Sequence, residues 1–159
     1  MASSQTEQDN RYYARAAGIL RLEPADAQEA YDFTLAAFEL SERFGTVVML
    51  RLTTRVCHSN TVVRPARLIA PPSRADFKRD VPARVMIPAY ARPAHRKLRQ
   101  RLADVAAWGE TCDLNRRIDG DGELGIITSG VAFQHVREAA PTASDLKLRP
   151  PWPLPPEAC

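Results

Sequence analysis

The stretch EPADAQEAYDFTLAAFELSERFGTVVMLRL, residues 23–52, decides the fold. Pro24 stands two residues before Asp26, and Glu29 stands three residues after Asp26, a spacing that satisfies free backbone amides at a helix N-terminus. Gly45 is placed to end this helix. The residues after it, 46–52, are mostly apolar and rich in β-branched side chains, which is typical of a strand buried in a parallel sheet. The stretch therefore predicts a helix followed directly by a parallel strand.

Apolar residues of this predicted helix fall on two neighbouring stripes. The first stripe repeats every three or four residues and comprises Ala30, Phe33, Ala37, Leu40 and Phe44. The second comprises Ala27, Tyr31, Leu35 and Phe38. Because the two stripes together cover much of the helix, we expect a broad side of it to be buried against other elements.

The preceding residues extend the same pattern. Residues 5–17 favour a helix that Gly18 ends, and residues 19–22 follow as a short strand. The order of helix, strand, helix and strand with short connections predicts an α/β fold with a partial parallel sheet.

The composition changes after Asn60. Six prolines follow within one segment, namely Pro65, Pro71, Pro72, Pro82, Pro88 and Pro93. Each proline removes a backbone donor and fixes φ, so an extended connector is predicted from Arg64 to Pro93. A helix is expected over residues 92–110, then strands over 124–128 and 145–148 with a short helix over 131–140 between them. These elements are too few to close either sheet, so we expect both ends to belong to larger domains.

Composition limits the class of protein. The chain has 159 residues, 45% of them apolar, and a net charge of +3, which is modest for a nucleic-acid-binding protein. No run approaches the roughly 20 apolar residues that span a bilayer, and the first ten residues lack the features of a secretory signal. We therefore expect a cytoplasmic protein with no membrane association. The three cysteines form no C-x-x-C pair, which predicts free thiols rather than disulfides.

The segment LRLTTRVCHSN, residues 50–60, holds the main candidate site. A nucleophile and base at Cys57 and His58 are not favoured, because adjacent residues at a strand end point to opposite sides. No metal site is predicted, since the histidines and cysteines show no ligand spacing. Polar residues beyond the carboxyl end of a parallel strand often line a ligand crevice, which favours a binding role for Thr54, Arg55 and His58. The alternative is structural, with Arg55 pairing with a carboxylate of the first helix and His58 capping a loop.

Three weaker motifs occur further along. The Gly-Asp-Gly of residues 120–122 mimics a metal and diphosphate motif, but it follows no predicted strand and no asparagine comes after it, so we interpret it as a turn. The basic run of residues 92–101 could meet phosphates or an acidic partner, although its charges spread as on a solvated helix. The Thr-Ser-Gly of residues 128–130 could hold an anion at a helix N-terminus, but close strand-to-helix packing is more common.

Several longer stretches resemble one family. They are SSQTEQDNRYYA, LEPADAQEAYDFTLAAFELSERFGT, VMLRLTTRVCHS, VMIPAYAR, LGIITSGVAFQHVREA and a closing PLP, in the family's order. SSQ-x-EQD and RLTTRV-x-HS are the distinctive motifs. On these residues the chain resembles an internal fragment of the alpha subunits of indolepyruvate ferredoxin oxidoreductases, which are thiamine diphosphate-dependent 2-oxoacid:ferredoxin oxidoreductases. The stretch of residues 61–74 matches poorly.

The resemblance implies a domain organisation. Residues 1–62 would be the C-terminal part of the pyrimidine-binding domain, residues 63–120 a connector with one helix, and residues 121–159 the start of a transketolase C-terminal-like α/β domain. In the whole subunit, the thiazolium carbon of thiamine diphosphate attacks the 2-oxo carbon of an aryl pyruvate such as indolepyruvate, and CO2 leaves. Electrons pass through 4Fe-4S clusters to ferredoxin, and coenzyme A takes the acyl group.

The resemblance also implies partners and site residues. A beta subunit completes the enzyme, magnesium accompanies the cofactor, and the catalytic glutamate, the metal motif and the cluster cysteines belong outside these residues. We therefore expect no catalytic residue, no complete cofactor site and no turnover by this chain alone. The residues expected at a cofactor or subunit interface are Ser4, Gln5, Glu7, Gln8, Asp9, Thr54, Arg55 and His58. A stand-alone interaction module and, less favoured, a nucleic-acid-binding protein are the alternatives.

Overall fold

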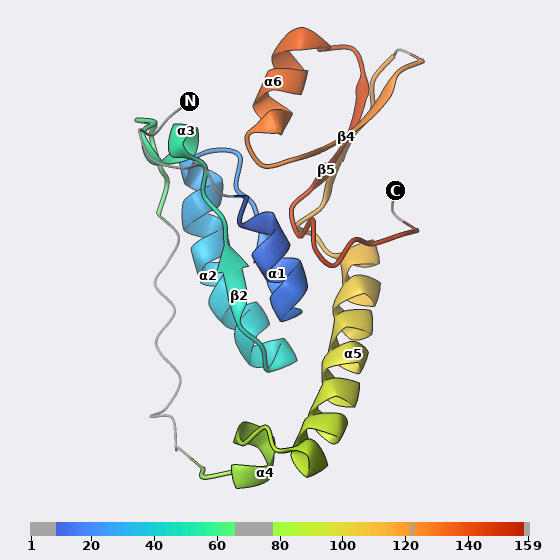
Figure 1. Cartoon of the computed structure of the whole chain (residues 1–159). Coiled ribbons are helices and arrows are strands. Elements are labelled where there is room, and N and C mark those ends of the chain that lie inside the picture. The colour runs from blue at the N-terminus through green and yellow to red at the C-terminus, as the bar shows by residue number, and fades with distance from the viewer. Residues whose placement is uncertain (1–8, 66–77, 122, 158–159) are drawn as a thin grey trace.

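Two small sheets and six helices make up the described part of the chain, which in this computed structural model comprises residues 9–65, 78–121 and 123–157 (Figure 1). The helices are α1 (Arg11–Ala17), α2 (Ala27–Phe44), α3 (Thr54–Cys57), α4 (Val81–Arg84), α5 (Pro88–Thr111) and α6 (Ala132–Ala139). The strands are β1 (Leu20–Leu22), β2 (Val48–Leu50), β3 (Arg116–Ile118), β4 (Gly125–Ser129) and β5 (Ser144–Leu148). None of these helices combines the length and apolar character needed to cross a membrane.

Helix α2 begins and ends where the sequence predicts. The Asp26 side chain accepts a hydrogen bond from the Glu29 amide at 2.8 Å, and the Glu29 carboxylate accepts one from the Ala25 amide at 2.9 Å. These two bonds satisfy amides that a helix start leaves free. At the other end Gly45 has a φ of +57°, a left-handed conformation that glycine adopts without strain.

The core lies between α2 and the sheet of β1 and β2. These strands pair in parallel with Leu20 opposite Val48 and Leu22 opposite Leu50, as the predicted parallel sheet requires. The first apolar stripe of α2 faces this sheet, and the buried side chains of the cluster are Leu20, Leu22, Phe33, Leu40 and Val105. Each such burial contributes about 1.5–3 kcal/mol. The second stripe is only partly covered, since Ala27, Tyr31 and Leu35 are half-buried and Phe38 is 73% exposed. The prediction of a broad buried side is thus correct for one stripe only.

The second sheet has the order β3-β5-β4. Strands β4 and β5 are parallel and connected through α6, which forms a compact βαβ unit. Both strands and the helix were predicted from the sequence. Strand β3 pairs antiparallel with β5, with Arg117 opposite Leu146. The sequence did not indicate β3, because its Arg-Arg-Ile sequence shows no apolar alternation.

The connector prediction was wrong in part. Helix α5 begins at Pro88 rather than near residue 92, it contains Pro93, and the short helix α4 precedes it. Pro88 is tolerated at the first helical position, and Pro93 in the second turn costs one hydrogen bond in a segment otherwise rich in helix-favouring alanine and arginine. Residues 66–77, with Pro71 and Pro72, lie outside the described part of the chain.

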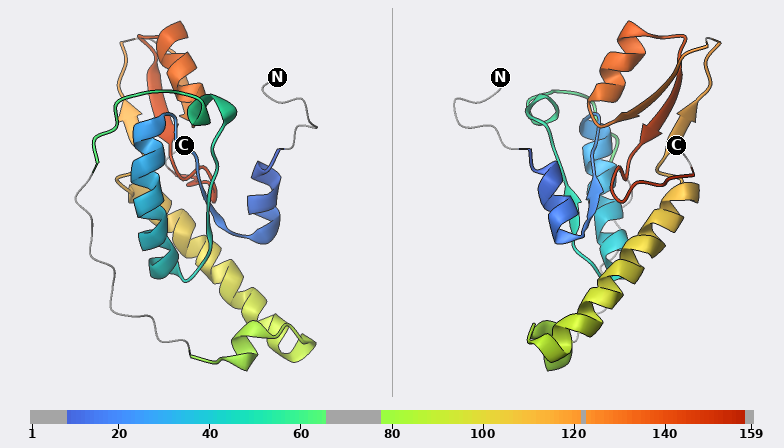
Figure 2. Two further views of the ribbon diagram at one scale, coloured as in Figure 1. Left: turned by 90° about the vertical axis from the view of Figure 1, so that its left-hand side faces the viewer. Right: turned by 45° about the vertical axis from the view of Figure 1, so that its right-hand side comes forward.

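The C-terminal segment joins the two sheets. The Arg21 amide of β1 donates to the carbonyl of Trp152 at 3.1 Å, and the Glu23 amide donates to the carbonyl of Arg149 at 3.4 Å. Strand β1 is therefore flanked by β2 on one side and by this segment on the other. In both views of Figure 2, α4 and the start of α5 lie away from the two sheets.

We predict that Asp26→Ala lowers the free energy of unfolding by about 1 kcal/mol, because the Glu29 amide loses its cap. Chemical denaturation with far-ultraviolet circular dichroism measures this difference. Asp26→Asn is the matched control, since asparagine caps helices equally well. Equal losses in both variants would contradict a capping role.

Candidate functional site

Polar side chains gather where the two parallel strands of the first sheet end. Glu23 follows β1 directly, and Arg51 follows β2 directly. The Arg51 amide donates to the carbonyl of Leu22 at 2.9 Å, which holds the two strand ends together. The carboxyl edge of a parallel sheet is the usual place for a ligand crevice.

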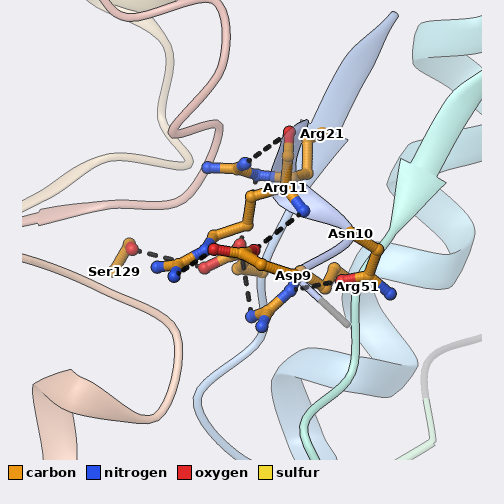
Figure 3. A network of polar contacts seen from close by, with 7 residues as sticks. Asp9, Asn10, Arg11, Arg21, Arg51 and Ser129 are labelled. Atoms are coloured by element: carbon orange, nitrogen blue, oxygen red, sulfur yellow. Dashed lines mark hydrogen bonds and ion pairs between the residues drawn. The ribbon is translucent and has the colours of Figure 1, made fainter. Parts of the chain in front are cut away.

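Glu23 is the centre of this edge, and its partners Arg21, Arg51 and Ser129 are labelled in Figure 3. One of its carboxylate oxygens forms ion pairs with Nε of Arg21 at 3.1 Å and with Nη1 of Arg51 at 3.4 Å. The other oxygen accepts a hydrogen bond from the hydroxyl of Ser129 at 3.3 Å. Glu23 is buried, and burial lowers the pKa of Arg21. The carboxylate therefore connects β1, β2 and the turn after β4.

The N-terminal segment attaches to the same edge through Arg51. The Nε atom of Arg51 donates to the side-chain oxygen of Asn10 at 2.8 Å. Next to Asn10, the Arg11 guanidinium contacts both carboxylate oxygens of Asp9, each at 2.7 Å. The hydrogen bond from Arg11 lowers the pKa of Asp9 to about 2, so this carboxylate is ionised at neutral pH. Segments 41 residues apart in the sequence are thus joined by one arginine.

A small cleft of about 150 Å³ opens beside this network. Arg11, Arg51, Thr53 and Ser129 contribute to its lining. The Oγ1 atom of Thr53 is buried and has no hydrogen-bond partner within the described residues. Guanidinium and hydroxyl groups in such a cleft can bind a small polar or anionic group. The Arg51 guanidinium, however, is already paired with the Glu23 carboxylate.

The Thr-Ser-Gly turn packs closely against the network. Gly130 has a φ of +56°, and a Cβ atom there would lie 3.3 Å from a carboxylate oxygen of Glu23. This agrees with the packing interpretation of the turn.

The predicted site residues are only partly brought together. Ser4, Gln5, Glu7 and Gln8 lie outside the described residues, and Asp9 reaches the network through Arg11 and Asn10. The other predicted residues lie on or next to α3, which begins four residues after the end of β2; they are Thr54, Arg55 and His58.

The environment of α3 corrects the expectation that Cys57 and His58 lie at the end of a strand. Cys57 is the last residue of the short helix and His58 its cap, so neither lies at a strand end. Val56 is buried and anchors the helix, while Thr54, Arg55, Cys57 and His58 are exposed. In the described ranges the Arg55 guanidinium has no ion-pair partner. These exposed side chains are therefore accessible to a ligand or a neighbouring domain.

A second buried ion-pair cluster joins α2 to β5. One oxygen of the Glu29 carboxylate lies 2.5 Å from Nζ of Lys147 and 2.9 Å from Nη2 of Arg149. The Lys147 ammonium also lies 3.9 Å from the centre of the Phe133 ring on α6, and Lys147 is only 1% exposed. Burial lowers the pKa of Lys147, and the hydrogen bond with Glu29 opposes this change.

Sequence reasoning missed the residues that carry both clusters, namely Glu23, Arg51, Glu29 as an ion-pair partner, and Lys147. The available signal was positional. Glu23 and Arg51 directly follow predicted strands, and Lys147 lies between the two leucines of the strand DLKL. No group of three or more histidine, cysteine or acidic residues that could hold a metal ion occurs within the described residues.

We compared the sequence with known proteins, and the result is consistent with a parallel strand pair that has a polar carboxyl edge. The family model for the thiamine diphosphate-binding domain of pyruvate flavodoxin/ferredoxin oxidoreductases matches residues 1–103. The chain belongs to this family.

Particular relatives are similar over almost the whole chain. Subunit IorA of indolepyruvate oxidoreductase from Methanothermobacter thermautotrophicus is 45% identical over 141 residues, which cover 87% of this chain and 23% of the relative. The same subunit from Methanothermobacter marburgensis is 41% identical, and that from Archaeoglobus fulgidus 36%, each covering 98% of this chain and 26% of the relative. The chain thus spans about a quarter of the length of these curated relatives.

We predict that Glu23→Gln lowers the free energy of unfolding by about 3 kcal/mol, because two guanidinium groups lose their carboxylate and Arg21 is buried. Urea denaturation measures the change. Arg117→Ala is the control, since its ion pair with Asp119 is exposed and is expected to contribute less than about 1 kcal/mol. A loss for Glu23→Gln no larger than that for the control would contradict the central role of this carboxylate.

The lowered pKa of Lys147 predicts a dependence of stability on pH. Between the folded-state pKa and the ordinary value of 10.5, the unfolded chain binds more protons, so stability gains with rising pH. We expect the unfolding free energy of the wild type, minus that of Lys147→Met, to increase from neutral pH toward 10.5. Denaturation at a series of pH values measures this difference. Lys97→Met is the control for the loss of an exposed lysine. A difference in unfolding free energy between the wild type and Lys147→Met that falls with rising pH would contradict the prediction.

Proposed function

We propose that this chain is part of the alpha subunit of a thiamine diphosphate-dependent 2-oxoacid:ferredoxin oxidoreductase that acts on aryl pyruvates such as indolepyruvate. The observation that carries the proposal is the identity of 36–45% to IorA subunits over 87–98% of the chain. The family match over residues 1–103 supports the cofactor assignment.

The proposed domain organisation follows the sequence resemblance. Residues 1–62 contribute to the pyrimidine-binding domain, residues 63–120 form the connector, and residues 121–159 begin a transketolase C-terminal-like domain. The parallel pair of β1 and β2 and the βαβ unit of β4, α6 and β5 are compatible with these assignments.

The cofactor would lie beyond the carboxyl edge of the first sheet. When bound, thiamine diphosphate supplies the thiazolium carbon that reacts with the 2-oxoacid. The exposed side chains of Thr54, Arg55 and His58 supply hydrogen-bond donors toward the cofactor or a neighbouring domain, and Arg51 orients Asn10 at the same edge. The role proposed for these residues is to bind and position the cofactor or the neighbouring domain. The buried Thr53 hydroxyl could hydrogen-bond to a polar group in the adjacent cleft.

The remaining components belong to the whole enzyme. Magnesium and 4Fe-4S clusters are expected in the full-length subunit, and a beta subunit, ferredoxin and coenzyme A complete the reaction in the cytoplasm. Because the chain spans about a quarter of its relatives, we expect no turnover by the chain alone.

A chimera tests the proposal. The aligned segment of Methanothermobacter thermautotrophicus IorA is replaced by this chain, and reduction of ferredoxin with indolepyruvate is measured with the beta subunit and coenzyme A present. We expect turnover within about tenfold of the parent subunit, a loss of at most 1.4 kcal/mol in transition-state stabilisation. A soluble chimera that binds thiamine diphosphate and the beta subunit but reduces no ferredoxin would refute it.

Within this chimera, Arg55→Ala tests the site residues. Loss of one charged hydrogen bond is expected to weaken thiamine diphosphate binding or beta-subunit binding about tenfold. Isothermal titration with each partner separates the two effects. Arg116→Ala, an exposed arginine on β3, is the matched control. Unchanged affinity for both partners would exclude Arg55 from the interface.

A further inference from the structure

Two parts of the chain that are distant in sequence meet at the small cleft beside the Glu23 network. One wall carries Arg11, Arg51 and Thr53, which belong to the N-terminal segment and to the carboxyl edge of the first sheet. The other wall is the turn after β4 with the first residue of α6, residues 129–132. Arg11, Arg51 and Ser129 are labelled in Figure 3. A ligand in this cleft would therefore contact both the first sheet and the βαβ unit.

The residues that line the cleft hold five hydrogen-bond donors that have no acceptor within the described part of the chain. The Thr53 hydroxyl is buried and has no partner. Nη1 of Arg11 and Nη2 of Arg51 are free as well, because the recorded bonds of these guanidinium groups use Nε and the other Nη atom. The amides of Val131 and Ala132 also lack an acceptor, since the chain turns there from β4 into α6.

The charge balance around the cleft is positive. Among the described residues that line it, Glu23 alone is acidic, and both of its carboxylate oxygens are already engaged. With Arg21 and Asp9 included, three guanidinium groups face two carboxylates. Burial lowers the pKa of Arg21, and the positive charges of Arg51 and Arg11 lower it further. A negative charge placed in the cleft would therefore be attracted to this network.

The size of the cleft and the number of donors together select a class of ligand. A volume of about 150 Å³ has room for roughly five water molecules at about 30 Å³ each, so a small ion or the end of a larger molecule fits. A phosphate has several oxygens that accept hydrogen bonds without offering competing donors, whereas each water also donates. Arginine side chains and the amides at a helix start are the usual donors to such an oxyanion.

We propose that this cleft binds a phosphate-type oxyanion, which bridges the carboxyl edge of the first sheet and the start of α6. The Thr53 hydroxyl donates to one oxygen, the guanidinium groups of Arg11 and Arg51 neutralise the charge, and the amides of Val131 and Ala132 hold the opposite side. Because the anion bonds to both parts, its concentration regulates how firmly the βαβ unit is attached to the first sheet. The inference goes beyond the proposed function, because it concerns no group that reacts.

Isothermal titration of the full chain with inorganic phosphate, at constant ionic strength, tests the site directly. We expect one site per chain with a Kd of about 1 mM or lower, and an unfolding midpoint that rises with phosphate concentration. Chloride at the same ionic strength should produce neither effect, since screening forms no directed hydrogen bonds. Absence of saturable binding up to about 10 mM phosphate would overturn the proposal.

Thr53→Val separates a hydroxyl that binds a ligand from one that supports the fold. Valine keeps the shape and removes a hydroxyl that has no partner among the described residues, so without phosphate the variant should be at least as stable as the wild type. It should bind phosphate about tenfold more weakly, because one hydrogen bond to a charged group is lost. Thr34→Val, at an exposed threonine of α2, is the matched control and should bind phosphate as the wild type does. Unchanged phosphate affinity in Thr53→Val would contradict the proposal.

Competition with thiamine diphosphate identifies the source of the oxyanion. Displacement of phosphate by thiamine diphosphate, with the same loss of affinity in Thr53→Val, would support the site and assign the anion to a phosphate group of that molecule. Phosphate binding that thiamine diphosphate leaves unchanged would support free phosphate as the ligand.

The IorA chimera shows whether the cleft remains open to a ligand in the larger subunit. We expect the soluble chimera to bind phosphate with the affinity of the chain alone. Loss of this binding would mean that another part of the subunit fills the cleft, and it would overturn the proposal. The result does not depend on turnover, so a chimera that reduces no ferredoxin but binds phosphate would refute the proposed function and leave this site intact.

Discussion

The buried carboxylate of Glu23 is the constraint on which the arrangement depends. It is held between the guanidinium groups of Arg21 and Arg51, and its second oxygen accepts from Ser129. A buried charge must be paired and hydrogen-bonded to be tolerated, so a displacement of β2 or of the turn after β4 would cost this carboxylate one of its partners. The position of the carboxyl edge of the first sheet therefore follows from one side chain that directly succeeds β1.

The cluster around Glu29 applies the same constraint at the start of α2. Glu29 has two tasks, because its amide is capped by Asp26 while its carboxylate pairs with Lys147 and Arg149 of the C-terminal part. The start of α2 is thus fixed to β5 by charge as well as by packing. With both clusters in place, the N-terminal segment, α3 and the turn after β4 are held around one polar edge.

Elements with a strong local signal could be predicted from the sequence. Helix α2, its cap and the parallel strand after it follow from Asp26, Glu29, Gly45 and the apolar periodicity, and each agrees with the structure. Weak or conflicting local signals gave wrong results. The prolines suggested an extended connector where α5 begins at Pro88, since a single proline in an early helical turn costs little when alanine and arginine surround it. Strand β3 exists because β5 offers a free edge, which no local pattern of its residues reveals.

The sequence by itself determined the family, the class of fold and the candidate residues that follow β2, because these depend on local motifs and on periodicity along the chain. Only the tertiary structure decided which side chains meet. Glu23 contacts Ser129 across 106 residues, Glu29 contacts Lys147 across 118, and Arg51 contacts Asn10 across 41. A sequence pattern does not specify such pairs, because they arise only when packing of the apolar stripes brings distant segments together and each buried charge requires a partner.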